Sequence, residues 1–222
     1  MKIAILGGTG DHGFGLGYRW ARAGHEIIIG SRSAAKGAAA AARLLERVPG
    51  GRVRGLDNLG AAGAGEMVVL SVPYEAQADT LAAVRPGLAG KLLVSVVAPL
   101  NLEKKGRARR PPGGLAAAEE AQAQVGPEAR VVCAFQHISA DHLLADDGAP
   151  AGDVLICGQR AADKALVAEL CADAGLRGVN AGGLANAAVV EGLTAVLISI
   201  NVIHKVSGAG IRVTGLPDTG RE

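Results

Sequence analysis

The sequence has 222 residues, of which 49% are hydrophobic and 2% aromatic, and its formal net charge is +2. This apolar content excludes a disordered chain, and the length fits one or two small lobes that share a core. A near-neutral charge with scattered basic residues and few aromatic side chains argues against a nucleic-acid-binding surface. We therefore expect no nucleic-acid partner.

Short runs rich in β-branched residues alternate with Ala-rich runs along the chain. In chain order, strands are expected at residues 2–6, 26–29, 52–55, 67–72, 92–97, 131–135, 154–157 and 176–179. Helices are expected between and after them at residues 13–23, 34–47, 75–84, 116–124, 161–174 and 185–206. Residues 101–114 are expected to be a loop or flap, and residues 141–150 a polar connection. Apolar strands separated by helices predict a parallel sheet covered on both faces, that is, an α/β Rossmann-type doubly wound fold.

The first expected strand runs directly into GGTGDHG at residues 7–13, which contains a G-x-G-x-x-G pattern at Gly8, Gly10 and Gly13. A strand before this pattern and a helix after it are typical of a dinucleotide-binding loop. In that reading Gly8 permits the tight turn, Gly10 lets the backbone approach the diphosphate, and Gly13 lets the helix pack on the strand. The alternative is a glycine turn without a ligand.

The end of the second expected strand indicates which nucleotide binds. NAD-preferring proteins place an acidic residue there, whereas this chain has Gly30, Ser31 and Arg32, with Lys36 one helical turn later. These side chains can hold a 2′-phosphate, since Ser31 donates, Arg32 forms a charged fork and Lys36 adds charge. The sequence therefore favours NADP. The alternative is an ordinary helix N-cap at Ser31 or Ser33 with solvated basic neighbours.

The strand at residues 67–72 is followed by Pro73, which ends the hydrogen-bonded ladder. The carboxyl ends of strands face the ligand crevice in such sheets, so Val72 and Pro73 are candidates for contact with the nicotinamide ribose. A strand end without any ligand contact is an equally open alternative.

Histidines supply the main acid/base candidates. His12 lies inside the glycine loop, where a surface position or a nucleotide contact is expected. His137 lies just past the strand at residues 131–135, again near the crevice, although a structural loop histidine is an alternative for it. We recognise no Tyr-x-x-x-Lys motif and no Ser/His/Asp catalytic set in the sequence. A hydride exchanged between two cofactors needs little acid/base machinery, because positioning does most of the work.

The remaining features bear on location and assembly. Cys133, Cys157 and Cys171 have no metal-ligand spacing, so we expect no metal and reduced thiols in the cytoplasm. The apolar stretch at residues 187–203 is interrupted by Glu191 and other polar residues, which predicts a buried helix and no membrane partner. This helix is apolar on more than one face, so we expect a homodimer through it.

Beyond these patterns, the opening KIAILGGTGDHGFGLGYRWARAGHEIIIGSR resembles the coenzyme F420-dependent NADP reductases. The likeness continues in the same order through VVLSVP at residues 68–73, LLVSVVAPLN at 92–101 and VVCAFQHISA at 131–140. It ends with GLANAAVVEGLTAVLISIN at residues 183–201, so it covers nearly the whole chain. It implies reversible hydride transfer between NADP(H) and the deazaflavin coenzyme F420.

The resemblance also implies roles for particular residues. The phosphates of NADP would lie against Thr9, Gly10, Asp11, His12 and Gly13, with the 2′-phosphate at Ser31, Arg32 and Lys36. The nicotinamide side would be bordered by Val72 and Pro73. The deazaflavin would face residues 135–138, with Gln136, His137 and Ile138, and also Thr194. Two positions depart from the family, since Gln136 stands where a histidine is common and Gly192 where a serine is expected.

The acidic tail of F420 suggests a basic landing strip. Residues 104–110 supply it through Lys104, Lys105, Arg107, Arg109 and Arg110. The alternative is a solvated flap whose charges serve solubility.

These observations predict an NADP-binding Rossmann domain at residues 1–150 and a small C-terminal lobe at residues 151–222. The lobe's strands either extend the sheet or pack beside it, and the lobe would contribute to the deazaflavin site and the dimer contact. Two alternative functions remain: an NADPH-dependent reductase of another small substrate, and a non-catalytic NADP(H)-binding redox sensor.

Overall fold

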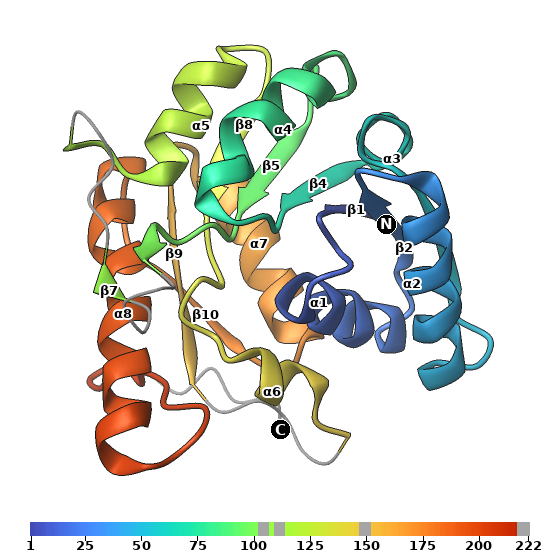
Figure 1. Cartoon of the computed structure of the whole chain (residues 1–222). Helices are drawn as coiled ribbons and strands as arrows, with labels where there is room; N and C mark the ends of the chain where they lie inside the picture. Colours follow the sequence, from blue (N-terminus) through green and yellow to red (C-terminus); the bar gives the residue numbers. More distant parts are fainter. Residues whose placement is uncertain (102–106, 109–113, 147–151, 217–222) are drawn as a thin grey trace.

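Eight strands form a single sheet at the centre of the molecule (Figure 1). The computed structural model describes residues 1–101, 107–108, 114–146 and 152–216. In sheet order the strands are β10 (Arg177–Asn180), β9 (Asp153–Gly158), β8 (Arg130–Cys133), β5 (Leu92–Ser95), β4 (Met67–Leu70), β1 (Lys2–Leu6), β2 (Glu26–Ser31) and β3 (Arg52–Asp57). All neighbouring pairs are parallel except β8 and β9. The predicted mainly parallel α/β sheet is confirmed.

Helices cover both faces of the sheet. One face packs against α1 (Asp11–Arg22), α2 (Ala34–Arg47), α6 (Ala140–Leu144) and α7 (Ala161–Asp173). The other face packs against α3 (Asn58–Ala64), α4 (Gln77–Val84), α5 (Ala117–Val125) and the first turns of α8 (Ala187–His204). Strand β1 shows why, because Ile3 and Ile5 point into the first core and Ala4 and Leu6 into the second. Continuous apolar strands are therefore buried on both sides.

The C-terminal strands extend the sheet, which settles the alternative left open by the sequence. Strand β9 runs antiparallel to β8, with Val132 opposite Gly158 and Cys133 opposite Cys157, and β10 is parallel to β9. The start of β9 consequently lies at the edge where β8 ends. The division at residue 150 stays a prediction, since both parts share this one sheet.

Several elements differ from the predicted boundaries. Helix α1 begins at Asp11, two residues earlier than expected, and the short helices α3 and α6 were not predicted. Three-residue 3₁₀ turns precede or follow the longer helices at Tyr74–Ala76, Arg85–Gly87 and Leu184–Asn186. Two short strands, β6 (Leu100–Asn101) and β7 (Arg107–Ala108), pair antiparallel within the predicted flap.

Helix α8 forms the edge of the molecule opposite β3 and α2 (Figure 1). With the preceding turn, Leu184–His204 is long and apolar enough by length and composition to cross a membrane, and 28% of its most apolar window is buried within the chain. Its buried residues include Val190 and Glu191, whereas Val196 and Ile203 are exposed. One side of α8 therefore packs on the chain's own core, and the other side is apolar and uncovered.

Candidate functional site

A cleft of about 420 Å³ opens at the carboxyl edge of the sheet. It lies where β4, β5 and β8 end, beside the start of α1 and the middle of α8. Of the residues singled out in the sequence, it is lined by Gly10, Asp11, His12, Val72, Pro73, Gln136, His137, Ile138 and Thr194. The remaining lining residues are Ser71, Tyr74, Glu75, Val96, Ala98, Leu100, Ser139, Leu197, Ile198, Asn201 and Ala209. Segments from distant parts of the chain thus meet in one mostly apolar cleft.

The glycine loop connects β1 to α1 at one end of this cleft. Gly7, not Gly8, carries the left-handed backbone of the turn (φ +71°), and a Cβ there would lie 2.4 Å from the Ser71 carbonyl oxygen. Gly8 is also packed tightly in this turn, since a Cβ there would lie 2.9 Å from the Ile5 carbonyl oxygen. Gly13 lies close to Ser71, since a Cβ on Gly13 would lie 2.9 Å from the Ser71 Oγ.

The side of the loop where a ligand would lie is open. A Cβ on Gly10 would meet nothing closer than a carbonyl oxygen at 3.7 Å, and Thr9, Gly10 and Asp11 are exposed. Gly10 is the N-cap of α1 and has no side chain to occupy the free N–H groups of the first turn. Those N–H groups and the positive end of the helix suit a phosphate.

A second group of residues lies next to the loop, at the end of β2. Ser31 is buried, whereas Arg32 and Lys36 are exposed, and within the described part of the chain neither basic side chain has a hydrogen bond or ion pair. Ser33 takes the N-cap position of α2 without a side-chain hydrogen bond. We call residues 7–13 with Ser31, Arg32 and Lys36 the nucleotide corner.

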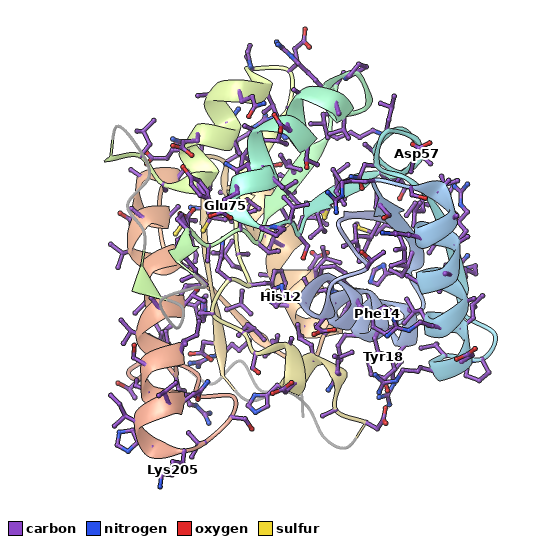
Figure 2. The ribbon with its side chains drawn as sticks, viewed as in Figure 1. His12, Phe14, Tyr18, Asp57, Glu75 and Lys205 are labelled. Atoms are coloured by element: carbon purple, nitrogen blue, oxygen red, sulfur yellow. The ribbon has the colours of Figure 1, made fainter. Side chains whose placement is uncertain are left out.

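One acidic residue near this corner was not anticipated. Asp57 ends β3 directly opposite Ser31 in the ladder. Its carboxylate accepts the Gly60 N–H at 2.7 Å and caps α3, and Figure 2 shows it on the outer side of the molecule, away from His12. The Asp57 carboxylate therefore serves as a helix cap. The ribose-binding acid of an NAD site stands at the end of the second strand, whereas Asp57 stands at the end of the third.

His12 occupies the middle of the molecule, at the start of α1 (Figure 2). Its Nε2 lies 3.1 Å from the carbonyl oxygen of Phe135, so Nε2 carries the proton and donates. Burial lowers the pKa of His12 to about 4, which leaves the ring neutral at neutral pH. The glycine loop is thus joined directly to the segment that follows β8.

That segment, with α8, forms the opposite wall of the cleft. Gln136 donates through Nε2 to the Ser95 carbonyl oxygen at 2.8 Å and to Cys133 Sγ at 3.0 Å, while its Oε1 is buried without a partner among the described residues. Thr194 Oγ1 donates to the Gln136 carbonyl oxygen at 3.1 Å. The Gln136 amide nitrogen, expected to face a ring, is instead turned into the protein.

His137 is held by the antiparallel strand β9. Its Nε2 donates to the Asp153 carbonyl oxygen at 2.8 Å, and its buried Nδ1 has no partner among the described residues. Burial lowers the pKa of His137, so the neutral ring presents Nδ1 as an acceptor. Arg177 in turn holds Asp153 through two hydrogen bonds, of 2.8 and 2.5 Å, and thereby lowers the pKa of that carboxyl group. We call Gln136, His137, Ile138 and Thr194 the second wall.

Glu191 anchors this wall to the rest of the chain. It lies one turn before Thr194 on α8, and its carboxylate accepts the N–H groups of Ala117 and Ala118 at 2.8 and 2.9 Å. These are free N–H groups of the first turn of α5, which a carboxylate satisfies well. Burial nevertheless raises the pKa of Glu191 to about 7.

Sequence reasoning missed most of the α8 contribution. Leu197, Ile198 and Asn201 line the cleft, and Asn201 Oδ1 accepts the Ala209 N–H at 2.9 Å, which folds the C-terminal segment over the cleft. The apolar run gave no signal for which helix face points inward. Phe135 is fully buried against Trp20 and does not line the cleft.

One departure from the expected family pattern, Gly192, has open surroundings. Position 192 has room for a side chain, because a Cβ on Gly192 would meet no atom within 4 Å.

The basic residues Lys104, Lys105, Arg109 and Arg110 lie outside the described residues, and only the backbone of Arg107 is described. The landing-strip hypothesis therefore stays a prediction.

Known proteins resemble this chain closely in sequence. Residues 2–99 match the family model described as NADP oxidoreductase coenzyme F420-dependent. The F420-dependent NADP reductase of Methanothermobacter marburgensis is 40% identical over 98% of this chain and 100% of its own length. The enzyme of the same name from Methanocaldococcus jannaschii is 39% identical over 97% of this chain and 99% of its own length.

Solved structures show the same fold. A crystal structure described as a putative F420-dependent NADP reductase from an Arthrobacter species is 28% identical, with a TM-score of 0.82 over 96% of this chain and 99% of its own. The reductive aminase of Aspergillus terreus in complex with NADPH is 21% identical, with a TM-score of 0.64 over 92% of this chain and 63% of its own. At that identity the second likeness concerns the fold alone.

Proposed function

This chain belongs to the family of coenzyme F420-dependent NADP oxidoreductases, and we propose that it transfers a hydride between NADP(H) and F420 in the cleft at the carboxyl edge of its sheet. The observation that carries the proposal is the junction of two surfaces in that cleft. The nucleotide corner and the second wall meet at His12, which belongs to the first and bonds to the segment that bears the second.

We place the adenosine half of NADP at the nucleotide corner. The diphosphate lies over Gly10 and the start of α1, where N–H groups are free and no side chain intrudes. The 2′-phosphate lies between Arg32 and Lys36, two exposed cations that have no partner among the described residues, with the buried Ser31 as a neutral donor beside them. The nicotinamide then enters the cleft past Val72 and Pro73, which border it.

We place the deazaflavin ring against the second wall. A flat aromatic ring fits an apolar cleft with a few convergent polar atoms. Here the apolar lining comes from Ile138, Leu197 and their neighbours, and the polar atoms are the unpaired Gln136 Oε1 and His137 Nδ1. Both unpaired atoms are acceptors, so they suit the N–H side of the ring.

The two substrates supply the redox chemistry when both are bound: NADPH and oxidised F420 take up one proton from water and become NADP⁺ and reduced F420, with the hydride passing between ring carbons. The chain's own residues position the rings and exclude water. His12 and His137 are neutral and each donates to a backbone carbonyl group, so both hold backbone in place and neither is set up as an acid at neutral pH.

Anaerobic mixing of the pure protein with NADPH and oxidised F420 tests the proposal. We expect NADPH absorbance and deazaflavin colour to fall together, with NADH giving much slower turnover. Turnover of NADPH only with a small carbonyl, imine or ferric substrate would support the alternative reductase instead. Binding of NADPH without any turnover would support the redox sensor.

We further propose a cytoplasmic homodimer joined through α8, with residues 1–150 as the NADP-binding part and residues 151–222 as the smaller part. The uncovered face of α8 carries Val189, Val196, Val202 and Ile203, which are 69%, 52%, 56% and 71% exposed. Burying an apolar patch of this kind favours association. Light scattering should give twice the chain mass, and Ile203→Glu should lower it toward one chain. A monomeric wild type would contradict the dimer.

A further inference from the structure

The segment that follows β8 adopts a backbone that an aromatic residue rarely takes. Phe135 has φ +73° and is fully buried, with its ring edge-on to Trp20 at 5.6 Å. A left-handed backbone at a residue with a Cβ is strained and persists only where its surroundings hold it. Contacts from elsewhere in the chain must therefore hold the backbone of Phe135, which directly precedes Gln136 and His137.

Two hydrogen bonds converge on the carbonyl oxygen of Phe135. One comes from the Ile138 N–H at 3.1 Å and closes a tight turn over residues 135–138. The other comes from His12 Nε2, also at 3.1 Å, from a residue 123 positions earlier in the chain. His12 therefore holds the first residue of the turn that carries the second wall.

The position of His12 links the turn at residues 135–138 to the expected NADP site. It follows Gly10 and Asp11 in the first turn of α1, where the N–H groups that suit the NADP diphosphate are found. A nucleotide that orders this first turn also orders the His12 side chain, and with it the carbonyl oxygen of Phe135. The link is short and needs no movement of the sheet.

We propose that His12 is a positioning residue that couples NADP binding to binding of the second substrate, by holding the turn at residues 135–138 in its left-handed form; this rests on the proposed function. Bound nucleotide stabilises the turn, and the second wall then receives the deazaflavin ring without a further ordering cost. The coupling is reciprocal, so the deazaflavin also strengthens nucleotide binding by the same factor.

A dead-end complex measures this coupling without turnover, because NADP⁺ and oxidised F420 cannot react with each other. The dissociation constant of oxidised F420 is read from its own fluorescence with and without saturating NADP⁺. For wild type we expect NADP⁺ to tighten F420 binding by about 5- to 150-fold, the usual range of such couplings.

Two replacements of His12 separate the hydrogen bond from the side chain's bulk. His12→Gln places an amide N–H at the same reach from Cβ and should keep most of the coupling. His12→Leu fills the space without a donor and should bring the ratio of the two dissociation constants close to 1. Arg32→Ala serves as the control, because it weakens NADP⁺ binding but should leave the coupling ratio at saturation unchanged.

Amide hydrogen exchange gives a readout that does not depend on F420. With NADP⁺ alone, exchange in peptides covering residues 135–144 should slow in wild type and His12→Gln but not in His12→Leu. The single tryptophan, Trp20, reports the same turn by its fluorescence, since it packs on Phe135.

The outcomes distinguish this inference from the proposed function. Coupling and protection that are equal in wild type and His12→Leu would overturn the role of His12, even if the enzyme reduces F420. Absence of F420 binding in every condition would contradict the proposed function, and the role of His12 would then stand or fall on the protection that NADP⁺ alone confers.

Discussion

The nucleotide corner and the second wall are built in opposite ways. The nucleotide corner comes from 30 consecutive residues, 7–36, and its charged side chains Arg32 and Lys36 are exposed. The second wall joins residues 136–138 to Thr194, and its polar groups Gln136 and His137 are 5% and 3% exposed. The first binds through free groups on a local backbone motif, whereas the second depends on packing. Substitutions should therefore change affinity at the corner and stability at the wall.

The largest effect should come from the core beneath the second wall. Phe135→Ala removes a fully buried ring that packs on Trp20, and we expect the free energy of unfolding to fall by about 3–5 kcal/mol. Urea unfolding followed by circular dichroism measures it. The matched control is Leu59→Ala, which truncates a side chain that is 48% exposed and should change stability by less than about 0.5 kcal/mol. A Phe135→Ala protein as stable as this control would show that the wall does not depend on its core.

The wall should also respond to pH through Glu191. Burial raises the pKa of this 2%-exposed carboxyl group from 4.5 to about 7, so the folded state binds a proton more tightly than the unfolded chain does. Its contribution to stability is complete below pH 4.5 and is lost as pH rises through 7, by about 3 kcal/mol in all.

Glu191→Gln removes this titration and isolates it from the other carboxyl groups. The stability of wild type relative to Glu191→Gln should fall between pH 5 and 8, as measured by urea unfolding at each pH. A constant difference across that range would mean that Glu191 titrates normally, and that its two hydrogen bonds to α5 fully offset its burial.

The nucleotide corner should lose affinity without losing stability. Arg32→Ala removes a charged donor for the 2′-phosphate, which should weaken NADPH binding by about 1.5–3 kcal/mol and leave NADH binding nearly unchanged. Calorimetry with both nucleotides measures the difference. Arg160→Ala removes an exposed arginine at the start of α7 and should affect neither. Equal losses for NADPH and NADH in Arg32→Ala would contradict the 2′-phosphate role.

The smallest effect should come from the hydrogen bond between α8 and the turn. Thr194→Val keeps the side chain's shape and removes the bond to the Gln136 carbonyl oxygen, which is worth about 1 kcal/mol. F420 should bind about fivefold more weakly in a fluorescence titration, with NADPH affinity unchanged. Ser199→Ala removes a hydroxyl whose one hydrogen bond among the described residues stays within α8, to the Ala195 carbonyl oxygen, and should leave both affinities unchanged.

The same contrast explains what could be predicted from the sequence. Strand β1, the glycine loop and β2 lie close together in the chain, so local pattern and spacing placed them correctly, and only the left-handed backbone of Gly7 was not anticipated. Continuous apolar runs look alike in either direction, so the antiparallel course of β9 left no mark in the sequence. The contact of His137 with Asp153 depends on that course and was not foreseen.

Short elements were missed for another reason. Helix α3 has the sequence NLGAAGA, in which two glycines weaken the helical pattern. Helix α6 has five residues, too few to show a helical period, and it forms because Arg19 donates to the carbonyl oxygens of His142, Leu143 and Ala145 around it. Whether such short segments form helices depends on their tertiary contacts.

Direct passage of the hydride across the cleft is the central claim, and labelled nucleotide tests it most directly. NADPH carrying deuterium at both C4 positions is mixed with oxidised F420 and the enzyme in ordinary water, and the reduced deazaflavin is examined by mass spectrometry. If the two rings meet between the nucleotide corner and the second wall, each reduced deazaflavin carries one deuterium. Reduced deazaflavin that contains only hydrogen from solvent would contradict direct transfer.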